Sequence, residues 1–353
     1  YLRLLEVIPH PDTDPEIVRF IRTYGERVLG KGVVLCKDEP NFIGNRFMTM
    51  SGMQIVNYTL DNNFTVEEVD ALTGPLIGRP KTATFRLNDL VGIDVAVGVA
   101  RNLYPAIPND PARTVLEHAG TTALFDKLLE NKWLGNKTGQ GFYKTVKGAG
   151  GEKEFWALNL KTFEYEAPTK PRFDSVSKHR KVENTGERIR LLINEDDRAA
   201  KLLWHHHAFL LAYASNRVPE ITESLLNVDN AQKWGISHEK GPIEIWSGQI
   251  TGYYSPQQKA YVPLERHPRA YTVERLRSKT GGEVARNGSA SILDMGDGVA
   301  LLEFHSIANA IDADLVEMSW KALDLLDRQF DALVVGNDAE RFCVGANLFM
   351  VVM

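Results

Sequence analysis

Apolar and polar positions at the start of the chain follow the order strand, helix, strand. Residues 4–8 are a short apolar run with strand character, and residues 14–29 have apolar side chains at helical spacing. Residues 32–36 are rich in β-branched side chains, which favour a second strand. We therefore predict a β-α-β unit at this end of the chain.

Helical spacing dominates from residue 38 to residue 133. A first helix is predicted as far as Leu60. Thr65 and the acidic residues after it predict the N-cap and first turn of another helix. Residues 137–143 have turn chemistry, and residues 148–151 look like a linker, so this helical region should end there.

The pattern changes twice in the middle of the chain. Residues 155–165 alternate well enough for a β-hairpin with Asn159 near its turn, and the two prolines that follow make the next stretch a poor helix. Helical spacing resumes from Asp197 to Tyr213 and again over residues 219–234. We predict a connector with a hairpin and then a second helical region.

The two helical regions resemble each other at a fixed offset along the chain. Residues 69–71 (Val-Asp-Ala) fall opposite residues 228–230 (Val-Asp-Asn), and Asp38 falls opposite Asp197. Both matches have an offset of 159 (228 − 69 and 197 − 38). We infer a degenerate duplication and expect the same order of helices in both regions.

Strand patterns return at the end of the chain. Two apolar runs within residues 291–305 flank a Gly296-Asp297-Gly298 turn, which indicates a hairpin. Residues 312–330 have nearly helical spacing, and the apolar residues 332–335 predict a buried strand. A new α/β domain should therefore begin near Ser289.

Composition limits the possible classes of protein. The 353 residues are 43% hydrophobic, enough for two or more domains. With 41 basic and 46 acidic residues, the net charge of −5 gives no electrostatic reason to expect nucleic acid or an anionic membrane as a partner. Cys36 and Cys343, the only cysteines, suit a reducing compartment, so we predict a cytoplasmic protein. No apolar run reaches the length of a membrane span.

Both ends of the chain look cut. Residues 1–6 contain neither an initiator methionine nor the basic segment of a signal peptide. Residues 348–353 are an apolar run without a cap or a polar tail, as if a helix had been interrupted. We expect the chain to be part of a longer protein.

Three motifs carry a family resemblance. They are Arg3-Leu4-Leu5-Glu6-Val7-Ile8-Pro9, then Cys36-Lys37-Asp38 with Asn41-Phe42-Ile43-Gly44-Asn45-Arg46, then Lys137-Thr138-Gly139-Gln140-Gly141-Phe142-Tyr143. In this order they resemble successive signatures of 3-hydroxyacyl-CoA dehydrogenases over residues 1–145. Residues 228–246 are similar to the second helical domain of larger multifunctional members, and residues 298–346 look like the opening of the crotonase fold.

The resemblance implies a mainly α fold with α/β ends. It indicates a remnant of a Rossmann-type domain, two tandem helical dehydrogenase domains and the start of a crotonase-like domain. The boundaries that we predict are 1–36 for the end of the NAD-binding domain, 37–145 for the first helical domain, 146–195 for the connector, 196–288 for the degenerate second helical domain and 289–353 for the crotonase-like start.

The activity implied by the resemblance is oxidation of an L-3-hydroxyacyl-CoA to a 3-ketoacyl-CoA in fatty-acid β-oxidation, with hydride passing to NAD. An acyl-CoA thioester is the implied substrate, an enoyl-CoA hydratase-like domain is the implied fusion partner, and self-association into a homo-oligomer is expected. The glycine-rich fingerprint that binds NAD is absent from the sequence, so its site should lie mostly outside the chain. We expect this chain alone to be inactive.

Three residues match functional positions of the two families. Glu6 matches the carboxylate that orients the catalytic histidine, a residue expected before Tyr1. Asn45 matches the asparagine that hydrogen-bonds the substrate near the reacting carbon. Ala346 matches the first oxyanion-hole amide of crotonases, where a backbone N–H stabilises the thioester enolate.

Other polar groups favour structural interpretations. Arg46, beside Asn45, is more typical of a structural ion pair than of a ligand site. The sequence Gly139-Gln140-Gly141 is typical of a turn, because it does not open a helix after a buried strand. The run His205-His206-His207 lacks the spacing of metal ligands on one helix face, so we predict no metal site.

Two alternatives to the leading hypothesis stay open. A helical scaffold or interaction module could keep the duplication and lack catalysis. A related dehydrogenase could act on another 3-hydroxy acid or its CoA ester. The residues before Tyr1 would discriminate between enzyme and scaffold, because only the enzyme needs a nucleotide fingerprint and a histidine there.

Overall fold

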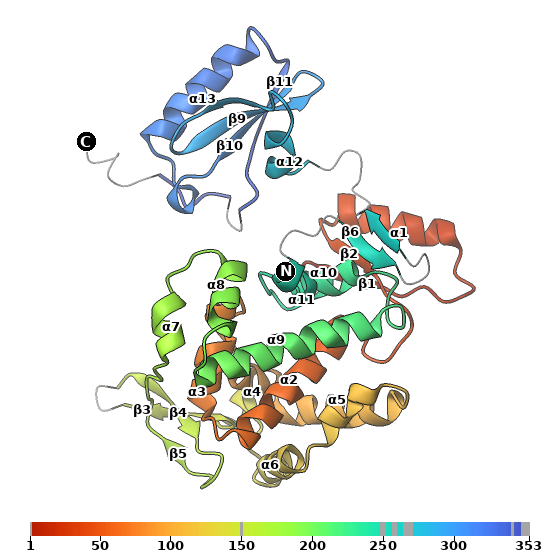
Figure 1. The fold of residues 1–353 in the computed structure, drawn as a ribbon, viewed down its shortest axis with the longest axis vertical. Coiled ribbons are helices and arrows are strands. Elements are labelled where there is room, and N and C mark those ends of the chain that lie inside the picture. The colour runs from red at the N-terminus through yellow and green to blue at the C-terminus, as the bar shows by residue number, and fades with distance from the viewer. Residues whose placement is uncertain are drawn as a thin grey trace. The chain divides into compact units, whose positions relative to one another are not determined.

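The structure is a computed structural model, and Figure 1 shows its fold. The chain divides into two compact units, residues 1–264 and residues 265–353. The structure describes residues 2–148, 151–247, 252–255, 260–263, 271–339 and 342–346. The predicted helix start at residues 348–353 lies outside the described residues.

The first unit begins with the predicted β-α-β arrangement. Strand β1 (Leu4–Val7) pairs in parallel with β2 (Gly32–Leu35), and α1 (Pro15–Arg27) connects them. Helix α1 lies close to this sheet at Gly25, where an added Cβ would be 2.9 Å from a methyl group of Val33. A glycine is therefore required for this close packing.

Five α-helices follow within residues 44–130. They are α2 (Gly44–Asp61), α3 (Val66–Thr73), α4 (Phe85–Val91), α5 (Ile93–Ala106) and α6 (Ala119–Glu130). The predicted N-cap of α3 is confirmed. The Thr65 hydroxyl accepts the Glu68 N–H, and the Glu68 carboxylate accepts the Thr65 N–H, which is a complete capping box.

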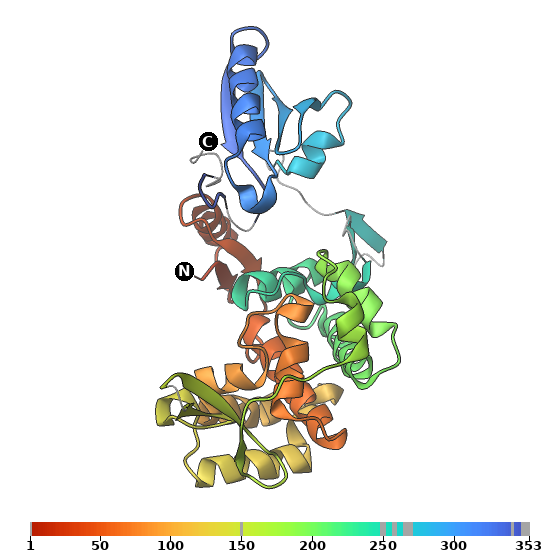
Figure 2. The ribbon, with the colours of Figure 1, turned by 90° about the vertical axis from the view of Figure 1, so that its left-hand side faces the viewer.

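A three-stranded antiparallel sheet follows the first helical region. It consists of β3 (Tyr143–Lys147), β4 (Lys153–Leu158) and β5 (Tyr165–Glu166), drawn in olive in Figure 2. The β4–β5 hairpin and its turn at Asn159 are confirmed. The linker predicted at residues 148–151 lies partly outside the described residues, and it falls between the paired strands β3 and β4 in the sequence.

The turn at Gly139-Gln140-Gly141 is confirmed, and a buried carboxylate explains its sequence. Asp89 of α4 accepts the N–H groups of Phe142 and Tyr143, both at 2.8 Å. A Cβ on Gly141 would lie 2.1 Å from the Asp89 carboxylate. The glycine thus makes room for the carboxylate that holds β3 against α4.

The second helical region contains α9 (Arg198–Arg217), α10 (Leu225–Gly235) and α11 (Pro242–Ser247). The predicted connector before it contains α7 (Asp174–His179) and α8 (Thr185–Ile193) in addition to the strands. A hairpin of β6 (Gly252–Ser255) and β7 (Ala260–Pro263) follows α11. Figure 1 shows α9 beside α2, and the edge-to-face contact of Phe47 with Tyr213 joins the two helices.

Two equivalent aspartates support the duplication. Asp70 of α3 accepts the N–H groups of Thr84, Phe85 and Arg86 at 2.7 to 3.1 Å, just where α4 begins. At an offset of 159, Asp229 of α10 accepts the N–H groups of Ile243 and Glu244 at 2.9 and 3.0 Å, at the start of α11. The helix order α2, α3, α4 thus recurs as α9, α10, α11 with the same carboxylate at the same junction.

The second unit is an α/β arrangement. Its sheet has the strand order β11-β10-β9-β8, formed by β8 (Glu283–Arg286), β9 (Ala290–Gly296), β10 (Val299–Phe304) and β11 (Ala332–Gly336). The predicted hairpin is confirmed in the antiparallel β9–β10 pair. Helix α13 (Ala313–Leu326) connects β10 to its parallel neighbour β11, as the pattern predicted.

Two predictions for this unit need correction. The boundary near Ser289 is too late, because β8 is hydrogen-bonded to β9, and α12 (Val273–Arg277) lies before β8 in the same unit. Strand β11 is not buried, since Val334 and Val335 are 43% and 50% exposed. Apolar composition alone does not distinguish a strand at the edge of the sheet from a central one.

Among the helices within the described ranges, none combines the length and the apolar character needed to cross a bilayer.

Candidate functional site

The Glu6 carboxylate is fixed at the beginning of α2. Glu6 lies on β1, and its Oε1 accepts the N–H groups of Ile43 and Gly44 at 3.0 and 2.9 Å. The Sγ atom of Cys36 lies 3.6 Å from the same oxygen. Two amide donors at the start of a helix thus hold this carboxylate oxygen in place. Within the described ranges, no hydrogen bond to Oε2 is found.

Asn45 is the next residue of α2 and is exposed on a cavity of about 510 Å³. Most of the cavity wall is apolar and comes from α2, α4 and α5, with Met53, Val91 and Val99 among its residues. Glu6 does not line this cavity, because its carboxylate turns to the amides of Ile43 and Gly44. The structure therefore brings Glu6 and Asn45 together at one helix end, and only Asn45 faces the cavity.

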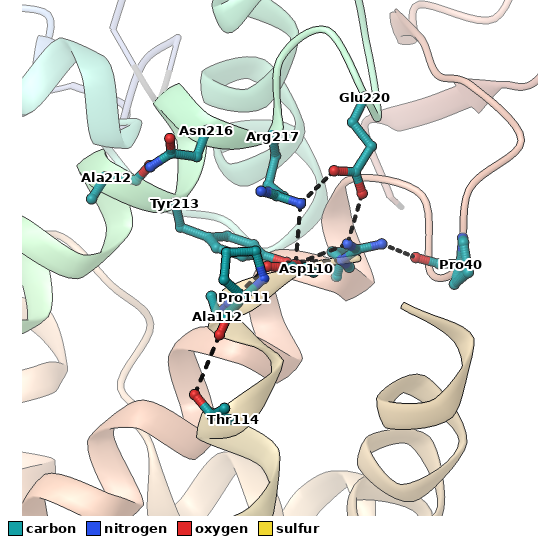
Figure 3. A network of polar contacts seen from close by, with 11 residues as sticks. Pro40, Asp110, Pro111, Ala112, Thr114, Ala212, Tyr213, Asn216, Arg217 and Glu220 are labelled. Carbon is teal, nitrogen blue, oxygen red and sulfur yellow. Dashed lines mark hydrogen bonds and ion pairs between the residues drawn. The ribbon is translucent and has the colours of Figure 1, made fainter. Parts of the chain in front are cut away.

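The predicted structural role of Arg46 is confirmed. Its side chain is fully buried and lies 3.0 Å from both the Asp110 and the Glu220 carboxylates. Its Nε donates to the Tyr213 hydroxyl at 2.8 Å, and that hydroxyl donates to Asp110 at 2.8 Å. Figure 3 shows this network, which also includes Arg217. Arg46 is thus a compensated charge that links α2 to α9.

A second arginine was missed by the sequence interpretation. Arg79 lines the cavity, and its guanidinium hydrogen-bonds the Nε2 atom of His206. Burial lowers the pKa of Arg79 to about 10, so it stays protonated at neutral pH. In the described part of the chain, no carboxylate forms an ion pair with it. The cavity therefore carries one positive charge without a neighbouring negative charge.

The histidines near Arg79 are neutral. His206 is buried, and its Nδ1 lies 3.1 Å from the amide oxygen of Gln54. Burial lowers the pKa of His207 to about 3 and holds the pKa of His206 and His238 well below the usual range. His238 lines the cavity with Arg79. The burial of His206 and His207 agrees with a structural interpretation of the histidine run.

The buried aspartates of the repeats are structural groups. Burial raises the pKa of Asp70 to about 6 and of Asp229 to about 7, while the amide donors act in the opposite direction. Each carboxylate binds the first amides of the next helix, and neither residue is among those that line the cavity. We therefore do not assign them to the site.

Ala346 lies in a short bridge in the second unit. It pairs with Ile311 in parallel, and the Ile311 N–H donates to the Gly345 carbonyl at 2.9 Å. Gly345 has a φ of 100°, a conformation that favours glycine. This bond uses the Gly345 carbonyl and leaves the Ala346 N–H outside it, so the predicted donor is compatible with the bridge.

Comparisons with known proteins point to one family. Residues 42–145 match the family model of the 3-hydroxyacyl-CoA dehydrogenase C-terminal domain. The chain is 38% identical, over its whole length, to a Bacillus subtilis protein named as a 3-hydroxyacyl-CoA dehydrogenase, of which it covers 48%. A Deinococcus radiodurans protein of the same name is 40% identical over 42% of this chain and 41% of its own length.

A more distant relative has a broader name. A Rickettsia prowazekii protein named as the trifunctional enzyme of a fatty acid oxidation complex is 25% identical over 69% of this chain and 32% of its own length. This chain spans less than half the length of each of these three relatives.

Proposed function

Because this chain belongs to the 3-hydroxyacyl-CoA dehydrogenase family, we propose that the protein oxidises L-3-hydroxyacyl-CoA to 3-ketoacyl-CoA in fatty-acid β-oxidation. One observation carries the proposal. The Glu6 carboxylate is bound by the amides of Ile43 and Gly44, directly before Asn45, which lines an apolar cavity. A carboxylate and an amide thus stand together beside space for an acyl chain.

Glu6 and Asn45 have different tasks in this proposal. Glu6 orients a histidine that the family resemblance implies upstream, and it stabilises the imidazolium that forms when this base takes the hydroxyl proton. Its Oε1 is held by two amides, which keeps the carboxylate in one position. The Asn45 amide hydrogen-bonds the substrate oxygen at the reacting carbon without adding charge.

The assignment of NAD rests on the family resemblance alone. The turn between β1 and α1 contains no glycine, and the Asp14 carboxylate already caps α1 by accepting the Glu16 N–H at 2.8 Å. A carboxylate there repels a pyrophosphate, so this turn does not fit the cofactor. We expect this chain to bind NAD weakly or not at all, and tight stoichiometric binding in a calorimetric titration would contradict this.

The dehydrogenase proposal is tested by Glu6→Gln in the full-length protein. We expect kcat with a 3-hydroxyacyl-CoA to fall roughly 100-fold, the usual scale for disabled acid/base catalysis. Glu16→Gln is the matched control, because Glu16 is exposed on α1 and pairs with Arg19. Equal rates for the two variants would exclude the orienting role of Glu6.

We further propose that the second unit is the start of an enoyl-CoA hydratase-like domain. Its β9–β10 hairpin, the α13 crossover and the left-handed Gly345 before Ala346 support this assignment. The name of the Rickettsia prowazekii relative agrees with more than one activity on one chain. The Ala346 N–H would stabilise the enolate oxygen of the thioester.

The hydratase proposal is tested at the same amide in the full-length protein. Ala346→Pro deletes the donor and should reduce hydration of enoyl-CoA by roughly 100-fold or more. Ala346→Gly keeps the donor and is the control. Undiminished hydration by a folded Ala346→Pro variant would refute the assignment.

A further inference from the structure

Arg79 and His238 hold equivalent positions in the two repeats. Their offset is again 159 (238 − 79), and each follows a residue with positive φ, Gly78 at 70° and Ser237 at 56°. The Glu239 N–H donates to the Gly78 carbonyl at 2.8 Å and ties the two loops together. Both side chains line the cavity that Asn45 lines. The duplication therefore brings two nitrogen-bearing side chains to one cavity.

The charge of this pair is unbalanced within the described part of the chain. Arg79 is protonated at neutral pH and His238 is neutral, as derived above from burial. No aspartate or glutamate lines the cavity. A guanidinium removed from water needs an anion or several hydrogen-bond acceptors to offset its lost hydration.

The contrast with Arg46 indicates that the missing partner is a ligand. Arg46 links α2 to α9, and two carboxylates and a hydroxyl satisfy its guanidinium. Arg79 has neutral His206 as its hydrogen-bond partner in the described part of the chain, and it lines the cavity. A guanidinium presents a planar fork that binds a carboxylate with two parallel hydrogen bonds.

We propose that Arg79 and His238 bind a carboxylate on the acyl chain of the substrate, so that the substrates include 3-hydroxyacyl-CoA thioesters whose acyl chain carries a terminal carboxylate. This inference rests on the proposed dehydrogenase function. Asn45 holds the reacting end of the acyl chain in the same cavity, and the apolar wall, with Met53 and Val99, covers its methylene groups. The carboxylate of the chain then supplies the negative charge that the cavity lacks.

The alternative anion is a phosphate of CoA, and the lining favours the carboxylate. The cavity wall is mostly apolar side chains of α2, α4 and α5, which suit methylene groups. A CoA phosphate carries more charge and is strongly hydrated, and one guanidinium with a neutral imidazole would offset it poorly.

The test compares matched substrates in the full-length protein. In the shorter pair, 3-hydroxyadipoyl-CoA carries the terminal carboxylate and 3-hydroxyhexanoyl-CoA ends in a methyl group. In the longer pair, 3-hydroxysebacoyl-CoA carries the carboxylate and 3-hydroxydecanoyl-CoA ends in a methyl group. The measured quantity is the kcat/KM of the carboxylated substrate divided by the kcat/KM of its methyl-ended partner. For at least one pair, Arg79→Met should lower this ratio by about 100-fold, because the substitution deletes one partner of a buried charge pair. His238→Leu should lower the same ratio about 10-fold, the scale of one neutral hydrogen bond.

The control is Arg190→Met, an exposed arginine of α8 whose loss should leave the ratio unchanged. An equal loss for both members of every pair would overturn the inference and assign the charge to CoA. If no 3-hydroxyacyl-CoA is oxidised, the proposed function fails, and calorimetric titration with hexanoate and its neutral analogue hexanamide still decides the inference. Binding of hexanoate that Arg79→Met weakens would support it, and equal binding of hexanoate and hexanamide would refute it.

Discussion

The two helical repeats build the same junction and present different side chains. In both repeats an aspartate at the same position, Asp70 or Asp229, binds the first amides of the next helix. The side chains around these junctions diverge. Asn45 faces the cavity in the first repeat, whereas Trp204 at the same offset is 53% exposed and lines no part of that cavity.

This difference separates what the fold requires from what the site requires. Buried amides at a helix start need an acceptor wherever the junction occurs, so both repeats carry the carboxylate. Asn45 of the first repeat lines the cavity, whereas Trp204 at the same offset does not. The second repeat contributes to the site through its loop at Gly235–His238 and not through a copy of Asn45.

The largest expected effect is on the free energy of unfolding and concerns the helix starts that Asp70 and Asp229 bind. Asp70→Ala leaves three buried amides and the Tyr143 hydroxyl without their acceptor, so the free energy of unfolding should fall by about 3 kcal/mol or more. Asp229→Ala removes two amide partners and should cost about 2 kcal/mol. Urea unfolding of this chain measures both, with Asp126→Ala as control, because the half-exposed Asp126 carboxylate only pairs with Arg101 at the surface. Equal free energies of unfolding for all variants would refute the structural role of the two aspartates.

The next effect concerns catalysis and distinguishes Asn45 from Trp204, the residue at the equivalent position of the second repeat. Asn45→Ala in the full-length protein should lower kcat/KM for a 3-hydroxyacyl-CoA roughly 100-fold, the scale of one lost transition-state hydrogen bond. Trp204→Ala should leave it within a factor of about two, because Trp204 is exposed and away from the cavity. Steady-state kinetics decides this, and similar losses in both variants would show that the repeats share the site.

A third effect, which is spread over several pH units, concerns acid stability. Burial lowers the pKa of His207 from its ordinary 6.5 to about 3, so between these values the unfolded chain binds a proton that the folded chain does not. Stability should therefore fall as the pH drops from 6.5 toward 3, by up to about 1.4 kcal/mol per pH unit from this residue.

The equivalent residue of the first repeat supplies the variant for this test. His207→Met installs the side chain of Met48, which lies at the same offset of 159 (207 − 48) and cannot be protonated. Urea unfolding at several pH values should show a shallower loss of stability in acid for the variant. A slope identical to that of the wild type would contradict the buried neutral histidine.

Regular patterns explain which parts of the fold could be predicted. The β-α-β start, the β9–β10 hairpin and the α13 crossover follow from local periodicity and turn residues, which act over a few positions. Strand β3 was missed because its sequence, Tyr143–Lys147, is short and polar, and its place depends on the distant Asp89. Long-range hydrogen bonds of this kind leave no local pattern.

The site was only partly predictable for the same reason. Glu6 and Asn45 were found through motifs that match a family, and their proximity follows from hydrogen bonds between β1 and α2. Arg79 and His238 belong to no such motif and lie 159 positions apart (238 − 79). The offset of the duplication was the one signal that could have paired them, since it aligns the two loops.

The most direct test of the account is a crystal structure of the full-length protein with a bound 3-ketoacyl-CoA. We predict that the Asn45 amide donates to the keto oxygen at a distance of about 3 Å and that the acyl chain enters the cavity lined by Met53 and Val99. A ligand whose reacting carbon binds away from Asn45, with this cavity empty of the acyl chain, would contradict it.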